Sequence, residues 1–170
     1  MKAAGSVEQR GFSLIELGIV LAVVMTLAGL TQPKLAELYA KHQIQTQANA
    51  LLFFLQSVKM LSMQQHSYVT VCPTVNKISC DKDWSKPLIA FVDDNRNSQI
   101  DGSDEIVLIQ EATPQLLANR RVLHFSPLFN AANTTATLKL CGGKTPLRRA
   151  IIISNMGRVR LEQTFSKVRC

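Results

Sequence analysis

The stretch RGFSLIELGIVLAVVMTLAGL, residues 10–30, holds a single carboxylate, Glu16, inside an apolar run. An ionisable side chain in such surroundings is energetically costly, so it needs a partner or a function. Cleavage between Gly11 and Phe12 would create an α-amino group one helical turn from Glu16. The amino terminus of a neighbouring copy could then neutralise the carboxylate, which predicts a chain that polymerises. The alternative is an ordinary single-span anchor whose glutamate has no role.

A set of positively charged side chains lies near the C-terminus, where seven fall within 26 residues: Lys144, Arg148, Arg149, Arg158, Arg160, Lys167 and Arg169. In a β-strand Arg158 and Arg160 would point to the same face, and Gly157 before them favours a turn. The planar guanidinium suits phosphate oxygens, so several arginines together can bind a nucleic-acid backbone without reading its sequence. Phe165 is the only aromatic residue of this tail, which favours backbone contacts to double-stranded DNA over a stacking platform for single strands.

The formal net charge of +7 is unevenly distributed along the chain. Residues 72–118 carry four Lys or Arg against eight acidic side chains, a net charge of −4, whereas residues 119–170 carry ten against Glu162 alone, a net charge of +9. The basic end predicts attraction to a polyanion or an anionic surface. The alternatives are solvated charges, or contacts with the acidic segment of a neighbouring subunit.

Four cysteines follow the apolar run: Cys72, Cys80, Cys141 and Cys170. An even number in an exported chain indicates disulfides in an oxidising compartment. The pairs closest in sequence are Cys72–Cys80 and Cys141–Cys170, although three pairings are possible. A Cys141–Cys170 bridge would hold the arginine-rich tail near Lys144. The alternative is a set of buried free thiols, and no cysteine or histidine spacing typical of zinc occurs.

The segment DDNRNSQIDGSD partly matches a calcium-binding loop, because oxygen-bearing side chains occupy five ligand positions: Asp93, Asn95, Asn97, Asp101 and Asp104. Ser98 replaces the glycine that the sharp turn of such a loop requires, so a simple hairpin turn between apolar strands is the preferred interpretation and no metal is expected. The chain has neither a Gly-rich phosphate loop nor G-x-S-x-G, and its three histidines lie far apart. The sequence therefore favours a protein that is not an enzyme and needs no cofactor.

These groups are positioned by two kinds of element. Residues 12–32 are 21 mostly apolar residues, or about 30 Å of helix, which predicts a membrane span with the basic residues 1–11 on the cytoplasmic side. Residues 33–66 show the period of an amphipathic helix. Residues 67–170 contain short β-rich runs separated by turn residues, typical of an antiparallel sheet or sandwich. We therefore expect an α+β fold with a long N-terminal helix packed on a C-terminal β-rich head.

The segment GFSLIEL resembles the processing site of type IV pilins and type II secretion pseudopilins, with Gly11, Phe12 and Glu16 at the motif positions. This resemblance implies that prepilin peptidase removes residues 1–11, that Phe12 is N-methylated, and that Glu16 pairs with a neighbour's amino terminus during assembly. FVDDNRNSQIDGSDEIVLI and IIISNMGRVR also resemble segments of the minor pilin group that includes FimT, FimU and GspH. The group implies a pilin-like fold, other major and minor pilins as partners, and a bacterial inner-membrane protein with a periplasmic head that later enters an extracellular pilus.

The tetrapeptide GRVR, residues 157–160, is similar to the GRxR motif of FimT-type minor pilins, which bind DNA during uptake for natural transformation. By this match Arg158 and Arg160 are the principal candidates for DNA contact, and the flanking cations are added on electrostatic grounds. The first hypothesis is therefore a minor type IV pilin of FimT type that binds DNA. The second is a purely structural minor pilin or a type II secretion pseudopilin that primes filament assembly without binding DNA. The third is a membrane-anchored enzyme.

Overall fold

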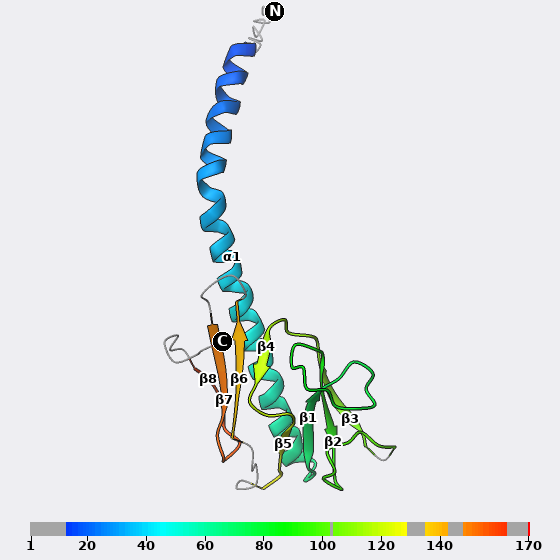
Figure 1. The fold of residues 1–170 in the computed structure, drawn as a ribbon. Coiled ribbons are helices and arrows are strands. Elements are labelled where there is room, and N and C mark those ends of the chain that lie inside the picture. The colour runs from blue at the N-terminus through cyan, green and yellow to red at the C-terminus, as the bar shows by residue number, and fades with distance from the viewer. Residues whose placement is uncertain (1–12, 103, 129–134, 143–147, 163–169) are drawn as a thin grey trace, which may run out of the picture. The chain divides into compact units, whose positions relative to one another are not determined.

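The computed structural model describes residues 13–102, 104–128, 135–142, 148–162 and 170. Within these ranges one long helix precedes eight strands (Figure 1). The elements are α1 (Leu14–Gln64), β1 (Val69–Pro73), β2 (Leu88–Val92), β3 (Ile106–Gln110), β4 (Leu116–Ala118), β5 (Leu123–Phe125), β6 (Ala136–Cys141), β7 (Arg148–Ile153) and β8 (Val159–Glu162). Several of the residues singled out by sequence lie outside the described ranges: Gly11, Phe12, Lys144, Lys167 and Arg169.

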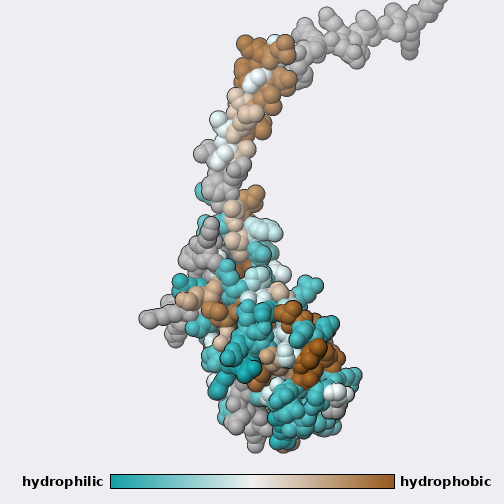
Figure 2. Space-filling model, turned by 45° about the vertical axis from the view of Figure 1, so that its right-hand side comes forward, coloured by the Kyte–Doolittle hydropathy of each residue, from teal (hydrophilic) through white to brown (hydrophobic). Residues whose placement is uncertain are grey.

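The chain divides into two compact units, residues 1–39 and residues 40–170. In the described part of the first unit, α1 exposes large apolar side chains on all sides, among them Leu14, Ile15, Val24 and Met25 (Figure 2). By length and composition no single helix in the described ranges qualifies as a membrane span, whereas Leu14–Gly29 and Lys34–Gln64 qualify together as a bent pair. The span predicted over residues 12–32 begins outside the described ranges.

The second unit contains two four-stranded antiparallel sheets and the C-terminal part of α1 (Figure 1). The first sheet has the strand order β3-β2-β1-β5 and the second has the order β4-β6-β7-β8. The chain passes from the second sheet to the first between β4 and β5, and β7 and β8 are joined by a tight hairpin. The expected fold, a long helix packed on antiparallel β-structure, is therefore confirmed.

One hydrophobic core joins the two sheets to α1. Ala48, Leu51, Leu55 and Val58 are fully buried, and their spacing of three or four residues places them on one face of the helix. The same cluster takes alternate residues from both sheets: Val69, Val71, Leu88, Ala90, Leu123 and Phe125 from the first, and Leu116, Ala136, Leu138, Leu140, Ile151, Ile153 and Val159 from the second. Because strand side chains alternate between faces, the other residues of these strands point away from the core.

Two disulfides close segments of the head. Cys72 bonds to Cys80 across a Cα–Cα distance of 5.5 Å, and Cys141 bonds to Cys170 across 6.1 Å. These are the two pairs closest in sequence. Since Cys141 lies opposite Arg148 in the sheet, the second bridge holds the last residue of the chain beside the start of β7.

Candidate nucleic-acid interface

Arg158, the residue before β8, and Arg160, within β8, lie on the outer face of the second sheet. Among the described residues β8 lies at the edge of this sheet, with Val159 opposite Ile153 and Arg160 opposite Ile152. Val159 is buried against the core, whereas Arg158 and Arg160 are both exposed. The alternation of the strand therefore places the two guanidinium groups on the same solvent-facing side.

A tight turn holds Arg158 in place. The backbone N–H of Gly157 donates to the carbonyl oxygen of Ser154 (2.8 Å), and the N–H of Ser154 donates to the carbonyl of Arg158 (3.0 Å). The Ser154 hydroxyl also accepts a hydrogen bond from the N–H of Arg158 (3.2 Å). Gly157 has a φ of +72°, a conformation that other L-residues adopt only at a cost. The turn predicted from Gly157 is therefore present and tightly bonded.

The side chain of Lys59 from α1 supports this turn from beneath. A Cβ atom added to Gly157 would lie 3.2 Å from Cε of Lys59 and 3.4 Å from its Nζ. The same Nζ donates a hydrogen bond to the carbonyl oxygen of Ser126, which follows β5 (2.8 Å). Partial burial lowers the pKa of Lys59 from its ordinary value. Lys59 thus fastens the β7–β8 turn to α1 and to the end of β5.

The remaining predicted cations of β7 lie at the opposite end of the sheet. Arg148 is opposite Cys141, five residues from Ile153, which corresponds to about 17 Å along the strand. Arg149 points toward α1, where its Nε donates to Oε1 of Gln45 (2.8 Å). The sequence cluster is therefore divided in space, with Arg149 turned inward and Arg148 on the outer side with Arg160.

Lys139 is a basic residue of the outer face that the sequence analysis missed. It lies on β6 opposite Ala150 and beside Leu117 of β4, and its neighbours Leu138 and Leu140 are buried. The alternation in ATLKLC would have assigned Lys139 to the solvent side, but the residue lies outside the C-terminal run of cations. On the opposite side of β7, Glu162 of β8 also pairs with Ala150. Glu162 contributes a negative charge to this face.

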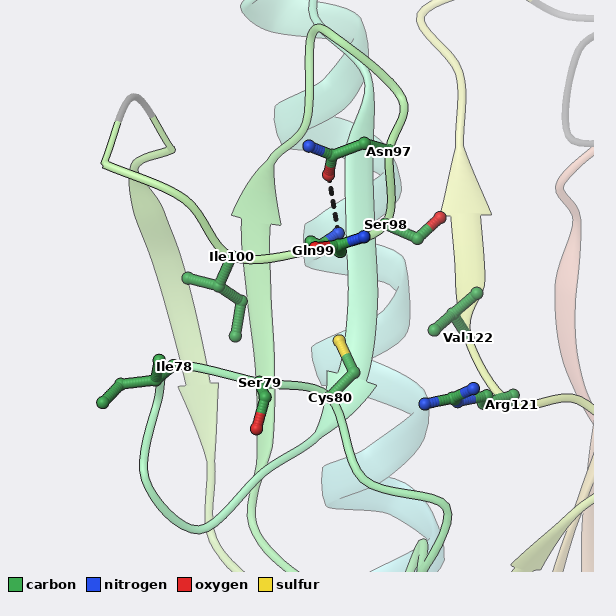
Figure 3. A pocket seen from close by; sticks show the side chains of 9 residues that line it. All are labelled: Ile78, Ser79, Cys80, Asn97, Ser98, Gln99, Ile100, Arg121 and Val122. Atoms are coloured by element: carbon green, nitrogen blue, oxygen red, sulfur yellow. Dashed lines mark hydrogen bonds between the residues drawn. The ribbon is translucent and has the colours of Figure 1, made fainter.

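A groove lies beside the first sheet, far in sequence from the arginine turn (Figure 3). It has a volume of about 410 Å³ and is lined by Ile78, Ser79, Cys80, Asn97, Ser98, Gln99, Ile100, Arg121 and Val122. A neighbouring hollow of about 510 Å³ shares Ser79, Cys80 and Arg121 with it. In Figure 3 Arg121 extends toward Cys80 from one wall, while the loop after β2 forms the opposite wall. The groove combines apolar side chains, neutral polar groups and one cation.

The loop after β2 is anchored by hydrogen bonds to the buried carboxylate of Asp93. This carboxylate is 1% exposed and accepts hydrogen bonds from the N–H groups of Asn97 (3.0 Å) and Ser98 (3.1 Å) and from the Thr70 hydroxyl (2.7 Å). The Thr70 hydroxyl also lies 2.9 Å from Nδ1 of His124, where burial lowers the pKa of the imidazole and the charge of Asp93 opposes that shift. In the described ranges no group of three His, Cys, Asp or Glu residues could hold a metal ion.

Glu16 lies in the first turn of α1, where a negative charge is favourable to the helix dipole. Its neighbours Leu14 and Ile15 are 88% and 74% exposed, and Leu17 is 52% exposed. The carboxylate is therefore surrounded by apolar side chains that lack packing partners within the described part of the first unit.

The segment that builds the core, the groove and the turn is also the segment that matches a known protein family. Residues 47–157, more than half of the chain, match the family model described as Type II transport protein GspH. The chain belongs to the GspH family. The matched segment ends at Gly157, so Arg158 and Arg160 follow it directly. No curated protein matches this GspH-family chain.

Solved structures with the same fold come from a minor pilin. The type IV minor pilin FimU of Pseudomonas aeruginosa in space group P21 shares 24% identity with a TM-score of 0.57, over 74% of this chain and 92% of that chain. FimU in space group P65 shares 25% identity with a TM-score of 0.55, over 72% and 94%. The GspH-family protein is thus a minor pilin or pseudopilin of the GspH–FimU group, a structural component and not an enzyme.

Replacing Gly157 with Ala should destabilise the head by about 1–2 kcal/mol, because the new side chain must adopt a left-handed backbone conformation. The added Cβ must also displace the Lys59 side chain. Urea unfolding of residues 40–170 measures the effect. This unit suits the experiment since it contains the core cluster and both disulfides.

The matched control is Gly102→Ala, because a Cβ at Gly102 meets nothing within 4 Å. It should leave the free energy of unfolding within about 0.5 kcal/mol of the wild type. Equal stability of the Gly157→Ala variant and the wild type would contradict the assigned role of this turn.

Proposed function

We propose that this GspH-family protein is a minor type IV pilin that binds double-stranded DNA through the outer face of β8 and the turn before it. The observation that supports this function best is the exposed pair Arg158, just before β8, and Arg160, within β8, which is an edge strand among the described residues. Two residues of a β-strand span about 6.8 Å, which equals the rise of two nucleotides along the axis of B-DNA. Both guanidinium groups can therefore contact phosphates of the same DNA strand.

Other cations extend this surface across the sheet. Arg160 is paired with Ile152 of β7. Arg148 lies four residues before Ile152 on the same strand, which corresponds to about 13 Å. Lys139 lies on β6, on the other side of β7 from β8 and opposite Ala150. Lys144, Lys167 and Arg169 add positive charge nearby in sequence. Because these are phosphate contacts, the proposed binding is sensitive to salt and indifferent to DNA sequence. We assign Arg149 to the fold, since its side chain bonds to Gln45.

The same proposal assigns the N-terminal motif to filament assembly. Prepilin peptidase cleaves between Gly11 and Phe12, Phe12 is N-methylated, and Glu16 pairs with the amino terminus of the neighbouring pilin. The protein begins in the bacterial inner membrane with a periplasmic head and then enters an extracellular pilus that takes up DNA in natural transformation. Several subunits along the filament strengthen weak individual contacts with DNA through avidity.

The groove beside the first sheet supports a second function, that of a purely structural minor pilin or type II secretion pseudopilin. Arg121 is exposed at the groove, and Val75 and Ile78 nearby are 70% and 69% exposed. A cation beside exposed apolar side chains suits an apolar and acidic segment of another pilin. This function predicts that the isolated head does not retain DNA at physiological salt.

Replacing Arg158 and Arg160 together with Gln should weaken DNA binding equally for all sequences. If the wild type engages about four phosphates, a tenfold rise in salt costs it between about three and four decades of affinity. Loss of two contacts should lower the slope of log affinity against log salt by about 1.8. Fluorescence anisotropy of residues 40–170 with a labelled 20-base-pair duplex, repeated across salt concentrations, measures both quantities.

The control removes two positive charges elsewhere, through Lys77→Gln and Lys82→Gln on the exposed loop after β1. This variant should keep the wild-type salt slope. An Arg158→Gln/Arg160→Gln head that binds DNA with unchanged affinity and slope would refute the assigned interface.

Replacing Glu16 with Gln should abolish incorporation into pili, because the neutral side chain cannot pair with the neighbouring amino terminus. Quantification of the protein in pili sheared from the cells measures incorporation, and its amount in the membrane fraction controls for expression. Glu37→Gln is the matched control, since Glu37 is an exposed acidic residue of the same helix. Normal incorporation of the Glu16→Gln protein would contradict the assembly role.

A further inference from the structure

The tip of the β7–β8 hairpin carries an apolar side chain that the fold does not use. Met156 is 76% exposed, and no large hydrophobic residue in the described part of the second unit is more exposed. Asn155 before it and Arg158, two residues after it, are exposed as well. Single exposed apolar residues are common on protein surfaces, so exposure alone assigns no role. The position of Met156 beside the arginine pair distinguishes it.

The turn keeps Met156 in this exposed position. The hydrogen bonds from Gly157 to Ser154 and from Ser154 to Arg158 close the turn on both sides of residues 155 and 156. Lys59 packs beneath Gly157, and Val159 is anchored in the core. Met156 therefore projects from a hydrogen-bonded turn, and contact with a partner costs little loss of backbone freedom.

We propose that Met156 enters the minor groove of double-stranded DNA and packs against sugars and base edges, while Arg158 and Arg160 hold the adjacent phosphates. This inference rests on the proposed function and adds an apolar contact to it. A single unbranched side chain is narrow enough for a groove about 6 Å wide, and methionine is among the apolar side chains that proteins place there. The negative potential of the minor groove also favours the neighbouring arginines.

The apolar contact and the phosphate contacts have different experimental signatures. Replacing Met156 with Ala removes apolar surface but no charge, so the affinity should fall about tenfold at every salt concentration. The slope against salt should stay at the wild-type value, because the number of neutralised phosphates is unchanged. Met156→Leu, which keeps an apolar side chain of similar size, should retain most of the affinity.

The experiment is a salt series of anisotropy titrations with residues 40–170 and a labelled 20-base-pair duplex. Met60→Ala serves as the matched control, since Met60 is a methionine of α1 that is 51% exposed and remote in sequence from the hairpin. We expect Met60→Ala to bind as the wild type does. Netropsin, a ligand of the minor groove, should displace the wild-type head from the duplex.

The other outcomes distinguish failure of the Met156 contact from failure of the proposed function. Wild-type affinity of Met156→Ala, together with weakened binding by Arg158→Gln/Arg160→Gln, would overturn the Met156 contact and leave the proposed function intact. Equal losses in Met156→Ala and Met60→Ala, or no displacement by netropsin, would also overturn the contact. Absence of DNA binding by the wild-type head would refute the proposed function itself.

Discussion

Both sheets of the head pack against the same face of α1, and the positions of Arg149, Arg158 and Arg160 follow from this contact. Leu51, Leu55 and Val58 occupy the centre of the core, and alternate residues of β6, β7 and β8 close over them. The residues between those core positions must then lie on the opposite face of the sheet. The burial of Val159 turns Arg160 outward, and the burial of Ile151 and Ile153 turns Arg149 toward the helix.

Lys59 connects this core to the proposed interface. Its alkyl chain lies beneath Gly157, and its amine bonds to the carbonyl after β5, so the arginine turn is fixed to elements from both sheets and the helix. A second rigid region is built around Asp93 and the Cys72–Cys80 bridge, which shape the groove near Arg121. The GspH-family head thus offers two preformed surfaces, one basic and exposed, the other hollow and lined by both apolar and polar side chains.

Sequence periodicity was sufficient to predict the long helix, the antiparallel strands and the outward pairing of Arg158 with Arg160, because these depend on local patterns. The two disulfides also joined the cysteines nearest in sequence. The separation of Arg149 from the other cations could not be predicted, since it depends on the packing of β7 against Gln45, 104 residues earlier. The groove likewise requires three loops that are distant in the chain and meet only in the folded head.

The proposed DNA interface is the outer face of β8 and the turn before it. A heteronuclear NMR titration of residues 40–170 with a 15-base-pair duplex at low salt tests it directly. Binding at this interface should give amide shift changes concentrated in residues 154–162, with smaller changes at Lys139 and Arg148. Changes centred on the groove around Ile78 and Arg121, or no changes at all, would contradict it.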